Sequence, residues 1–216
     1  DNVYRGAGEE VESIFPPWHP AFIKAEDLSK IRQDISKAKQ LLKEEGYGPG
    51  GKTLKLTMLH GNGGAHVQRA VLIQAQLKTV GIDLSIVKQK MGAMLKQMYT
   101  GKYELALWQM LGGPTIQEFT WNMYHSGGSS NPSYYNKEGG YKNAEAEKLL
   151  DEIVKTNDPA VAKPSLIKLQ QIIFDDVPVA FANWRNHRTV RNPWVKNFKT
   201  GKLKGMEDLR KVWLDK

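Results

Sequence analysis

The spacing of apolar side chains divides the first half of the chain into alternating helices and strands. Apolar residues recur at helical spacing over 29–46, where Ser29 can cap the first turn and Gly46 supplies a left-handed stop. Over 53–59, apolar and polar residues alternate instead, which predicts a strand with one buried face. Further elements follow in the same way: a helix over 65–80, a strand from Ile82 to Ile86, a helix over 91–101 and a strand from Leu105 to Leu107.

This alternation of strands and helices predicts a parallel sheet, because parallel neighbours need a long crossover connection. Ligands of such sheets usually bind beyond the carboxyl ends of the strands. Trp108 and the glycine-rich segment 60–64 lie at such ends. We therefore expect an α/β fold, with a β-α-β-α-β parallel core in a mixed sheet and a ligand site at that edge.

The second half of the chain reads as a long loop followed by helices and a short hairpin. Residues 112–141 are polar, aromatic and glycine-rich, which is typical of a functional loop. Asn143 can cap one helix, and Asp158 precedes another that we expect to break at Pro164, because proline has no backbone N–H. The remaining elements are a strand over 179–184, its hairpin partner over 188–190, and a tail over 195–216.

Composition narrows the class of protein. The 216 residues, 40% of them hydrophobic, are enough for one large domain or for a domain with a tail. No apolar run approaches the length of about 20 residues that spans a bilayer. The net charge is +8, but the 31 Lys and Arg are interspersed with 23 Asp and Glu, which favours a soluble basic surface over a nucleic-acid-binding one. The absence of cysteine excludes a disulfide scaffold and is compatible with export.

The familiar motifs of catalysis and cofactor binding do not occur in the sequence. Gly61 and Gly63 follow a strand, but the third glycine of a dinucleotide-binding fingerprint would fall on His66, and no P-loop follows. The five histidines form no metal-binding motif, and no Gly-x-Ser-x-Gly elbow is present. The carboxylates of Asp151 and Glu152 are expected to be solvated on a helix surface. We therefore predict no catalytic activity, no cofactor and no metal.

A group of aromatic residues surrounds the glycine-rich segment after Trp108. Aromatic side chains in a polar loop either stack on a ligand or pin the loop to the core, and the sequence leaves both interpretations open. The group consists of Trp108, Trp121, Tyr124, Tyr134 and Tyr135.

Three stretches in this order resemble a known family. The first is "DISKAKQLLKEEGY" with "LKLTMLHGNGGAHVQRAVLIQAQLKTVGIDLSIVKQ" behind it, and the second is "GKYELALWQM". The third is "NAEAEKLLDEIVKTNDPAVAKPSLIKLQQIIFDDVPVAFANW", with "MEDLRKVWLDK" at the end. Together they resemble the family 5 extracellular solute-binding proteins of ABC importers, the dipeptide, oligopeptide and nickel class.

The resemblance implies that the chain is less than half of a family member. Residues 1–194 would form the carboxyl-terminal lobe of a type II (cluster C) periplasmic-binding-protein fold, and 195–216 a tail that crosses back to the missing amino-terminal lobe. In the family, two lobes close on a solute, and the closed form docks on ABC permease subunits in the membrane. The resemblance thus implies a transport protein, periplasmic or extracellular or a cell-surface lipoprotein, with no nucleic-acid partner.

One departure from the family pattern bears on the solute. Peptide-binding members of the family carry a pattern similar to "W-x-x-D", in which the Asp pairs with the ammonium of the peptide. In this chain, Trp108 matches the Trp, but Leu111 stands at the position of the Asp. An unpaired buried cation is costly, so this departure weighs against a peptide with a free amino terminus. A sugar, an opine-like compound or a metal chelate stays open, as does an α/β enzyme domain acting on a sugar or nucleotide. The candidate ligand residues are Met91, Trp108, Gln109, Met110, Leu111, Trp121, Asn122 and His125.

Overall fold

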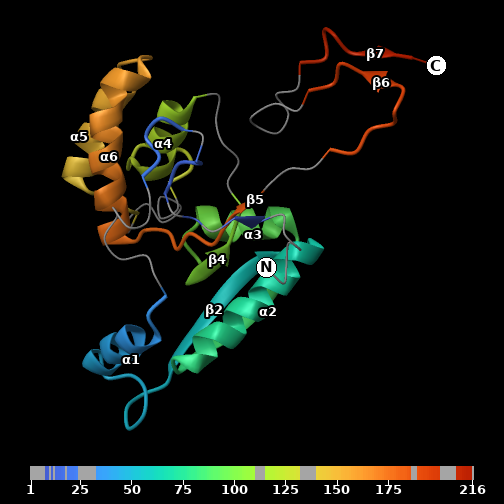
Figure 1. Cartoon of the computed structure of the whole chain (residues 1–216). Coiled ribbons are helices and arrows are strands. Elements are labelled where there is room, and N and C mark those ends of the chain that lie inside the picture. The colour runs from blue at the N-terminus through green and yellow to red at the C-terminus, as the bar shows by residue number, and fades with distance from the viewer. Residues whose placement is uncertain are drawn as a thin grey trace. The chain divides into compact units, whose positions relative to one another are not determined.

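The chain divides into two compact units. The computed structural model describes residues 8–9, 11, 13–17, 19–23, 33–109, 115–131, 140–185, 189–199 and 208–215 (Figure 1). The larger unit spans 11–181, and the smaller unit combines 1–10 with 182–216. The division at residue 195 that the resemblance implies stays a prediction.

A three-stranded parallel sheet forms the first part of the larger unit. The strands are β2 (Leu54–Gly61), β3 (Ile82–Gln89) and β4 (Leu105–Leu107), in the order β3-β2-β4. Both pairings of β2 are parallel, and the helices α2 (Gly64–Thr79) and α3 (Met91–Tyr99) make the crossovers. The predicted β-α-β-α-β core is therefore confirmed.

The two crossover helices cover opposite faces of this sheet. Successive strand residues point to opposite faces, so Met58 and Leu59 enter different cores. Met58 packs with Ala70 of α2, whereas Leu59 packs with Met94 and Met98 of α3. The carboxyl edge of the sheet, where Trp108 follows β4, thus lies between two helical layers.

Helix α1 (Ile35–Glu44) begins later than predicted. Asp34 caps it, since its Oδ1 accepts a hydrogen bond from the Lys37 backbone N–H at 2.8 Å. The predicted start at Ser29 is therefore wrong for this helix, and Ser29 itself lies outside the described residues. The predicted stop is confirmed, because Gly46 adopts a left-handed φ of 80°.

Three helices form the second part of the larger unit: α4 (Ile116–Tyr124), α5 (Ala144–Ile153) and α6 (Pro159–Asp176). α5 packs against both α4 and α6. The predicted cap of α5 is confirmed, since the Asn143 side chain accepts hydrogen bonds from two backbone N–H groups. Their shared core includes Met123, Tyr124, Leu149, Leu150, Ile153, Leu166, Leu169 and Ile173.

Two predictions about these helices are wrong. Residues 116–124 are helical rather than part of a long loop, because the Thr115 hydroxyl accepts from the Glu118 N–H at 3.1 Å and caps the first turn. Helix α6 also runs through Pro164 without a break. Pro164 and Ala160 are exposed, so water can satisfy the Ala160 carbonyl that loses its helical donor.

The smaller unit contains two short antiparallel ribbons. β1 (Gly8–Glu9) pairs with β5 (Trp184–Arg185), and β6 (Val195–Lys196) pairs with β7 (Trp213–Leu214). The hairpin predicted between 179–184 and 188–190 is wrong for the described residues, because β5 pairs with β1 from the other end of the chain. Such long-range pairing leaves no local pattern in the sequence. None of the helices in the described ranges has the length and apolar character to span a membrane.

Candidate functional site

Three of the predicted ligand residues lie at the carboxyl edge of the sheet. Trp108 and Gln109 directly follow β4 and are half-buried. Trp108 packs at the border of the α3-side core, against residues such as Leu59. Met91 opens α3 just beyond the carboxyl end of β3, and 47% of its surface is exposed. The predicted position of Trp108 at a strand end is therefore confirmed, and Gln109 and Met91 lie at the same edge of the sheet. Their contact with a ligand stays a prediction.

Two further predicted ligand residues, Met110 and Leu111, lie outside the described residues. The glycine-rich segment 60–64 after β2 is a plain strand-to-helix turn. His60 at the end of β2 is only 4% exposed, and its Nδ1 lies 2.8 Å from the Gly61 carbonyl oxygen. His60 is thus a buried, hydrogen-bonded histidine of the sheet.

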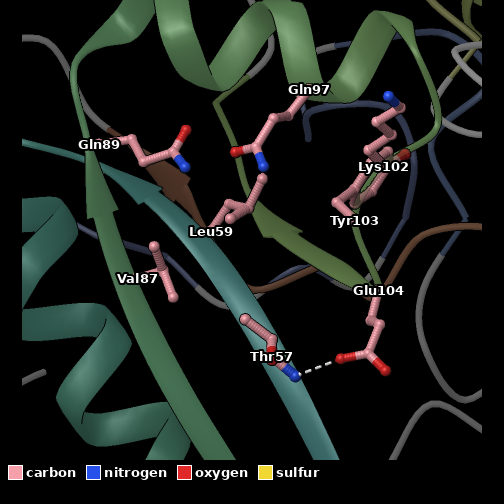
Figure 2. Close-up of a pocket in the computed structure, with 8 residues that line it drawn as sticks. All are labelled: Thr57, Leu59, Val87, Gln89, Gln97, Lys102, Tyr103 and Glu104. Atoms are coloured by element: carbon pink, nitrogen blue, oxygen red, sulfur yellow. Dashed lines mark hydrogen bonds between the residues drawn. The ribbon is translucent and has the colours of Figure 1, made fainter.

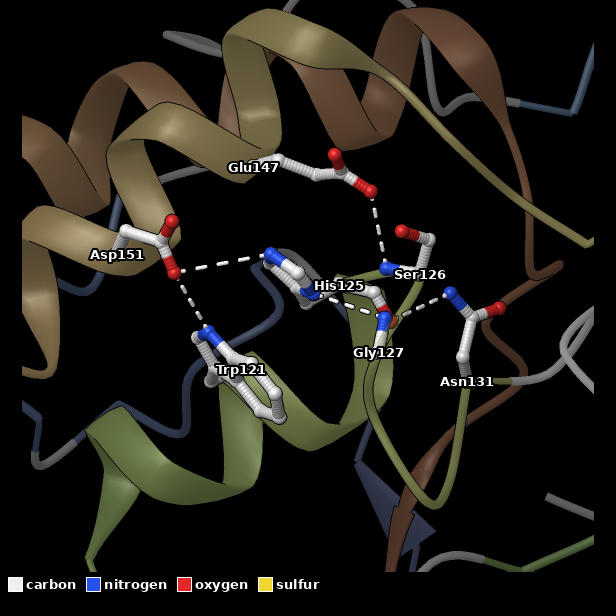
Figure 3. A network of polar contacts seen from close by, with 7 residues as sticks. All are labelled: Trp121, His125, Ser126, Gly127, Asn131, Glu147 and Asp151. Carbon is white, nitrogen blue, oxygen red and sulfur yellow. Dashed lines mark hydrogen bonds and ion pairs between the residues drawn. The ribbon is translucent and has the colours of Figure 1, made fainter.

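The other three predicted residues, Trp121, Asn122 and His125, belong to a polar network at the end of α4. Figure 3 shows Trp121 and His125 within this network. The rings of Trp121 and His125 stack, with centroids 4.4 Å apart and planes inclined by 14°. Asp151 of α5 joins them: its Oδ1 accepts from Trp121 Nε1 at 3.0 Å and lies 3.6 Å from His125 Nε2. One carboxylate oxygen therefore holds both rings against α5.

The backbone that follows fixes the proton on the His125 ring. The Gly127 N–H donates to His125 Nδ1 at 2.8 Å, so Nδ1 is the unprotonated nitrogen in this arrangement. The ring proton is then on Nε2, which faces Asp151. Both ring nitrogens are thus engaged within the chain, and the side chain is only 18% exposed.

The loop after α4 folds back on the helix. Asn122 Oδ1 accepts from the Ser129 hydroxyl at 3.0 Å. Asn131 is fully buried and donates to the carbonyl oxygens of His125 and Tyr141 at 3.0 and 3.1 Å. Gly128 approaches so closely that an added Cβ would lie 2.3 Å from the Asn122 carbonyl oxygen. The loop therefore has one defined conformation.

A second carboxylate of α5 holds the same loop. Glu147 accepts from the Ser126 N–H at 3.1 Å, one helical turn before Asp151 (Figure 3). Burial alone would raise the pKa of Glu147, but the hydrogen bonds from Ser126 and the nearby charge of Lys142 lower its pKa overall. Glu147 therefore stays ionised and anchors the loop to α5.

The network explains which residues sequence reasoning missed. Glu147 went unnoticed, and Asp151 was expected to be solvated, although Asp151 also binds two aromatic side chains. The available signal was the one-turn spacing of the two acids on the face that turns toward α4. In the described parts of the chain, no group of three His, Cys, Asp or Glu is arranged to hold a metal ion.

The family follows from the sequence itself. Residues 1–131 match the model of the bacterial extracellular solute-binding proteins, family 5 Middle. The chain belongs to family 5 of the bacterial extracellular solute-binding proteins. This confirms the resemblance and agrees with the parallel sheet found at the predicted position.

Among the proteins that this chain resembles are named peptide-binding proteins. The chain is 27% identical over 227 residues to the oligopeptide-binding protein AppA of Bacillus subtilis, covering 99% of this chain and 41% of AppA. The solved structure of AppA with a nonapeptide matches this chain with a TM-score of 0.74 and 23% identity. The match covers 99% of this chain and 44% of the AppA chain. The chain thus spans about two fifths of the length of AppA.

Two other solved structures share the family 5 fold at higher identity. DppA from Helicobacter pylori, in complex with the peptide STSA, has a TM-score of 0.71 at 26% identity over 84% of this chain and 34% of that one. An oligopeptide-binding protein from Thermotoga maritima, bound to mannohexaose, has a TM-score of 0.70 at 26% identity over 85% of this chain and 38% of that one. The structural neighbours therefore confirm one lobe of a periplasmic-binding-protein fold.

Proposed function

We propose that this chain is the carboxyl-terminal lobe of the solute-binding component of an ABC importer. The whole protein would close two lobes on a peptide or another small solute and deliver it to permease subunits in the membrane. The observation that carries this proposal is the match to oligopeptide-binding AppA, which extends over 99% of this chain but 41% of AppA. A match of that kind fits one lobe of a two-lobed binder.

The proposal includes a location outside the cytoplasm and a role without catalysis. Solute-binding proteins of importers meet their solutes in the periplasm or at the cell surface. The α4–α5 network fits a structural role, because Asp151 and Glu147 each use one carboxylate oxygen to hold Trp121, His125 and Ser126 within the chain. The rival enzyme domain would need an acid or base that faces a substrate.

We place the solute surface at the carboxyl edge of the sheet. Trp108 offers an aromatic face and Gln109 an amide, and Met91 adds an exposed flexible side chain at the same edge, after β3. An aromatic face with an adjacent amide suits peptide groups and sugar rings alike. Trp121, Asn122 and His125, which the sequence suggested as ligand residues, would instead support this surface by fixing the loop.

The class of solute is the finer part of the proposal. Peptide is favoured by the names of the relatives, and carbohydrate is the second candidate because the Thermotoga maritima relative holds mannohexaose. Leu111 stands at the position where the W-x-x-D pattern of peptide-binding members has Asp. We therefore expect a peptide to bind without an ion pair at its amino terminus. N-terminal acetylation should therefore leave peptide affinity nearly unchanged.

Calorimetry on the full-length protein tests this function. Tetrapeptides, their N-acetylated forms and manno-oligosaccharides are titrated in turn, and Trp108→Ala should weaken the binding of whichever solute binds by about tenfold or more. Trp194→Ala serves as the matched control, since Trp194 is 42% exposed in the smaller unit. Equal affinity in Trp108→Ala and the natural protein would contradict the assigned surface, and the absence of binding to all solute classes would contradict the function.

A further inference from the structure

A pocket lies on the face of the sheet that α3 covers (Figure 2). Its volume is about 380 Å³, within the range of small-molecule sites. The walls come from β2, β3, α3 and the segment before β4, and they share no residue with the proposed solute surface. The lining residues are Thr57, Leu59, Val87, Gln89, Gln97, Lys102, Tyr103 and Glu104.

Two amide oxygens in this pocket lack donors. Gln89 Oε1 and Gln97 Oε1 are both buried, and neither accepts a hydrogen bond from the part of the chain that the structure describes. In Figure 2 both amides lie at the end of the pocket nearest α3. A buried acceptor without a donor destabilises a protein, so two in one cavity are unusual. A ligand that brings N–H donors would satisfy both.

The remaining walls define the rest of such a ligand. Leu59 and Val87 supply an aliphatic surface of the pocket below the two amides. The exposed Lys102 and Glu104 also line the pocket and carry opposite charges. Glu104 is already engaged, because its Oε2 accepts from the Thr57 backbone N–H at 2.6 Å. The ammonium of Lys102 is directed away from the amides in Figure 2, and its flexible stem can turn it toward a bound anionic group.

We propose that this pocket binds a free α-amino acid with an aliphatic side chain. The α-ammonium donates to the oxygens of Gln89 and Gln97, the side chain packs on Leu59 and Val87, and the carboxylate faces Lys102. An ammonium suits the inner end because two of its three N–H donors can serve the two acceptors. The third donor can keep a water molecule, so the charge is not fully desolvated as it would be between two closed lobes. The pocket shares no residue with the proposed solute surface, so the two proposals can be tested independently.

Three small probes separate the parts of this proposal in calorimetry on the full-length protein. L-leucine carries ammonium and carboxylate, isopentylamine carries the ammonium alone, and 4-methylpentanoate carries the carboxylate alone. We expect L-leucine and isopentylamine to bind and 4-methylpentanoate to bind at least about tenfold more weakly. Failure of both ammonium probes to bind, or equal binding of all three, would overturn the proposal.

Variants of the pocket make the assignment specific. Gln97→Leu and Gln89→Leu keep the side-chain size and remove one acceptor, so each should lower the affinity for isopentylamine about tenfold. Each should also raise the melting temperature of the unliganded protein, because a buried unsatisfied oxygen is gone. Lys102→Met should weaken L-leucine but not isopentylamine. Gln76→Leu, at an exposed position of α2, is the control and should change no affinity.

Two results in the variants would count against the site. Unchanged affinity for L-leucine in both glutamine variants would show that the ligand binds elsewhere. A lower melting temperature of unliganded Gln97→Leu would show that this oxygen has a structural partner in solution. A surface that serves the transport of a solute would instead respond to Gln109→Ala. Because Gln109 is not among the lining residues of the pocket, this variant should leave L-leucine binding intact.

Discussion

The sheet region (54–109) and the helical region (115–176) differ in how their polar side chains are hydrogen-bonded. In the α3-side pocket of the sheet region, the buried oxygens of Gln89 and Gln97 accept no hydrogen bond from the described residues. The helical region engages Trp121, His125 and Asp151 with one another. Predicted ligand residues thus fall into two kinds. In the proposed function, those at the edge of the sheet contact the solute, and those on the helices hold a loop in place.

The largest effect should come from the core that holds the helical region together. Leu169 is fully buried in α6, and Leu169→Ala should lower the free energy of unfolding by about 3 kcal/mol, because it removes buried apolar atoms and leaves a cavity. Ile167→Ala is the matched control, since Ile167 is 40% exposed on the same helix and should change stability by less than about 1 kcal/mol. Urea denaturation followed by tryptophan fluorescence measures both. Similar losses in the two variants would mean that α6 does not pack as described.

The next effect contrasts glycines of the two regions. Gly128→Ala should destabilise the protein by about 2 kcal/mol, because the new Cβ would lie 2.3 Å from the Asn122 carbonyl oxygen. Gly64→Ala, in the first turn of α2, meets nothing within 4 Å and should be neutral or stabilising by about 0.5 kcal/mol. Thermal unfolding of the two variants makes the comparison. A neutral Gly128→Ala would show that the loop is not fixed by close contact with α4.

The alternation of the sheet region could be predicted from sequence because its signals are local. A two-residue period in β2 and a helical period in α2 follow from neighbouring residues alone. Helix α4 was missed, although Thr115 followed three residues later by Glu118 is a capping pattern. Its helical turns lie inside a glycine-rich and aromatic stretch, and only the packing of Met123 and Tyr124 against α5 and α6 makes the helix necessary.

The candidate site divides in the same way. Trp108 could be placed from sequence because a strand end is a position along the chain. The role of Trp121 could not be predicted from sequence, because it depends on Asp151, which lies 30 residues away on another helix. The donorless oxygens of the pocket have no sequence signature either. Gln89 and Gln97 resemble any other glutamine until the fold of β3 and α3 buries them.

A smaller effect separates the two tryptophans. Trp121→Phe keeps an aromatic ring against His125 but removes the N–H that Asp151 accepts, so stability should fall by about 1 kcal/mol. Solute affinity should stay unchanged, in contrast to Trp108→Ala. Calorimetry and urea denaturation of both variants test the contrast. If Trp121→Phe weakened solute binding without loss of stability, the ring would touch the solute, and the division between binding and supporting residues would be wrong.

The smallest effect is a dependence of stability on pH that arises in the helical region. Because the pKa of Glu147 is lower in the folded protein than its ordinary value of 4.5, its ionised form stabilises the fold above that value. This contribution is lost as the pH falls through the lowered pKa. Solvent screening limits the effect to about 0.5 kcal/mol.

Glu147→Gln isolates this contribution. The amide can still accept from the Ser126 N–H, but it does not titrate, so the stability difference between the variant and the natural protein should shrink between pH 6 and pH 3. Glu152→Gln, an exposed acid of the same helix, is the matched control and should show no such change. Urea midpoints across this range measure the difference. A difference that stays constant with pH would mean that Glu147 holds the loop by hydrogen-bond geometry alone, without help from its charge.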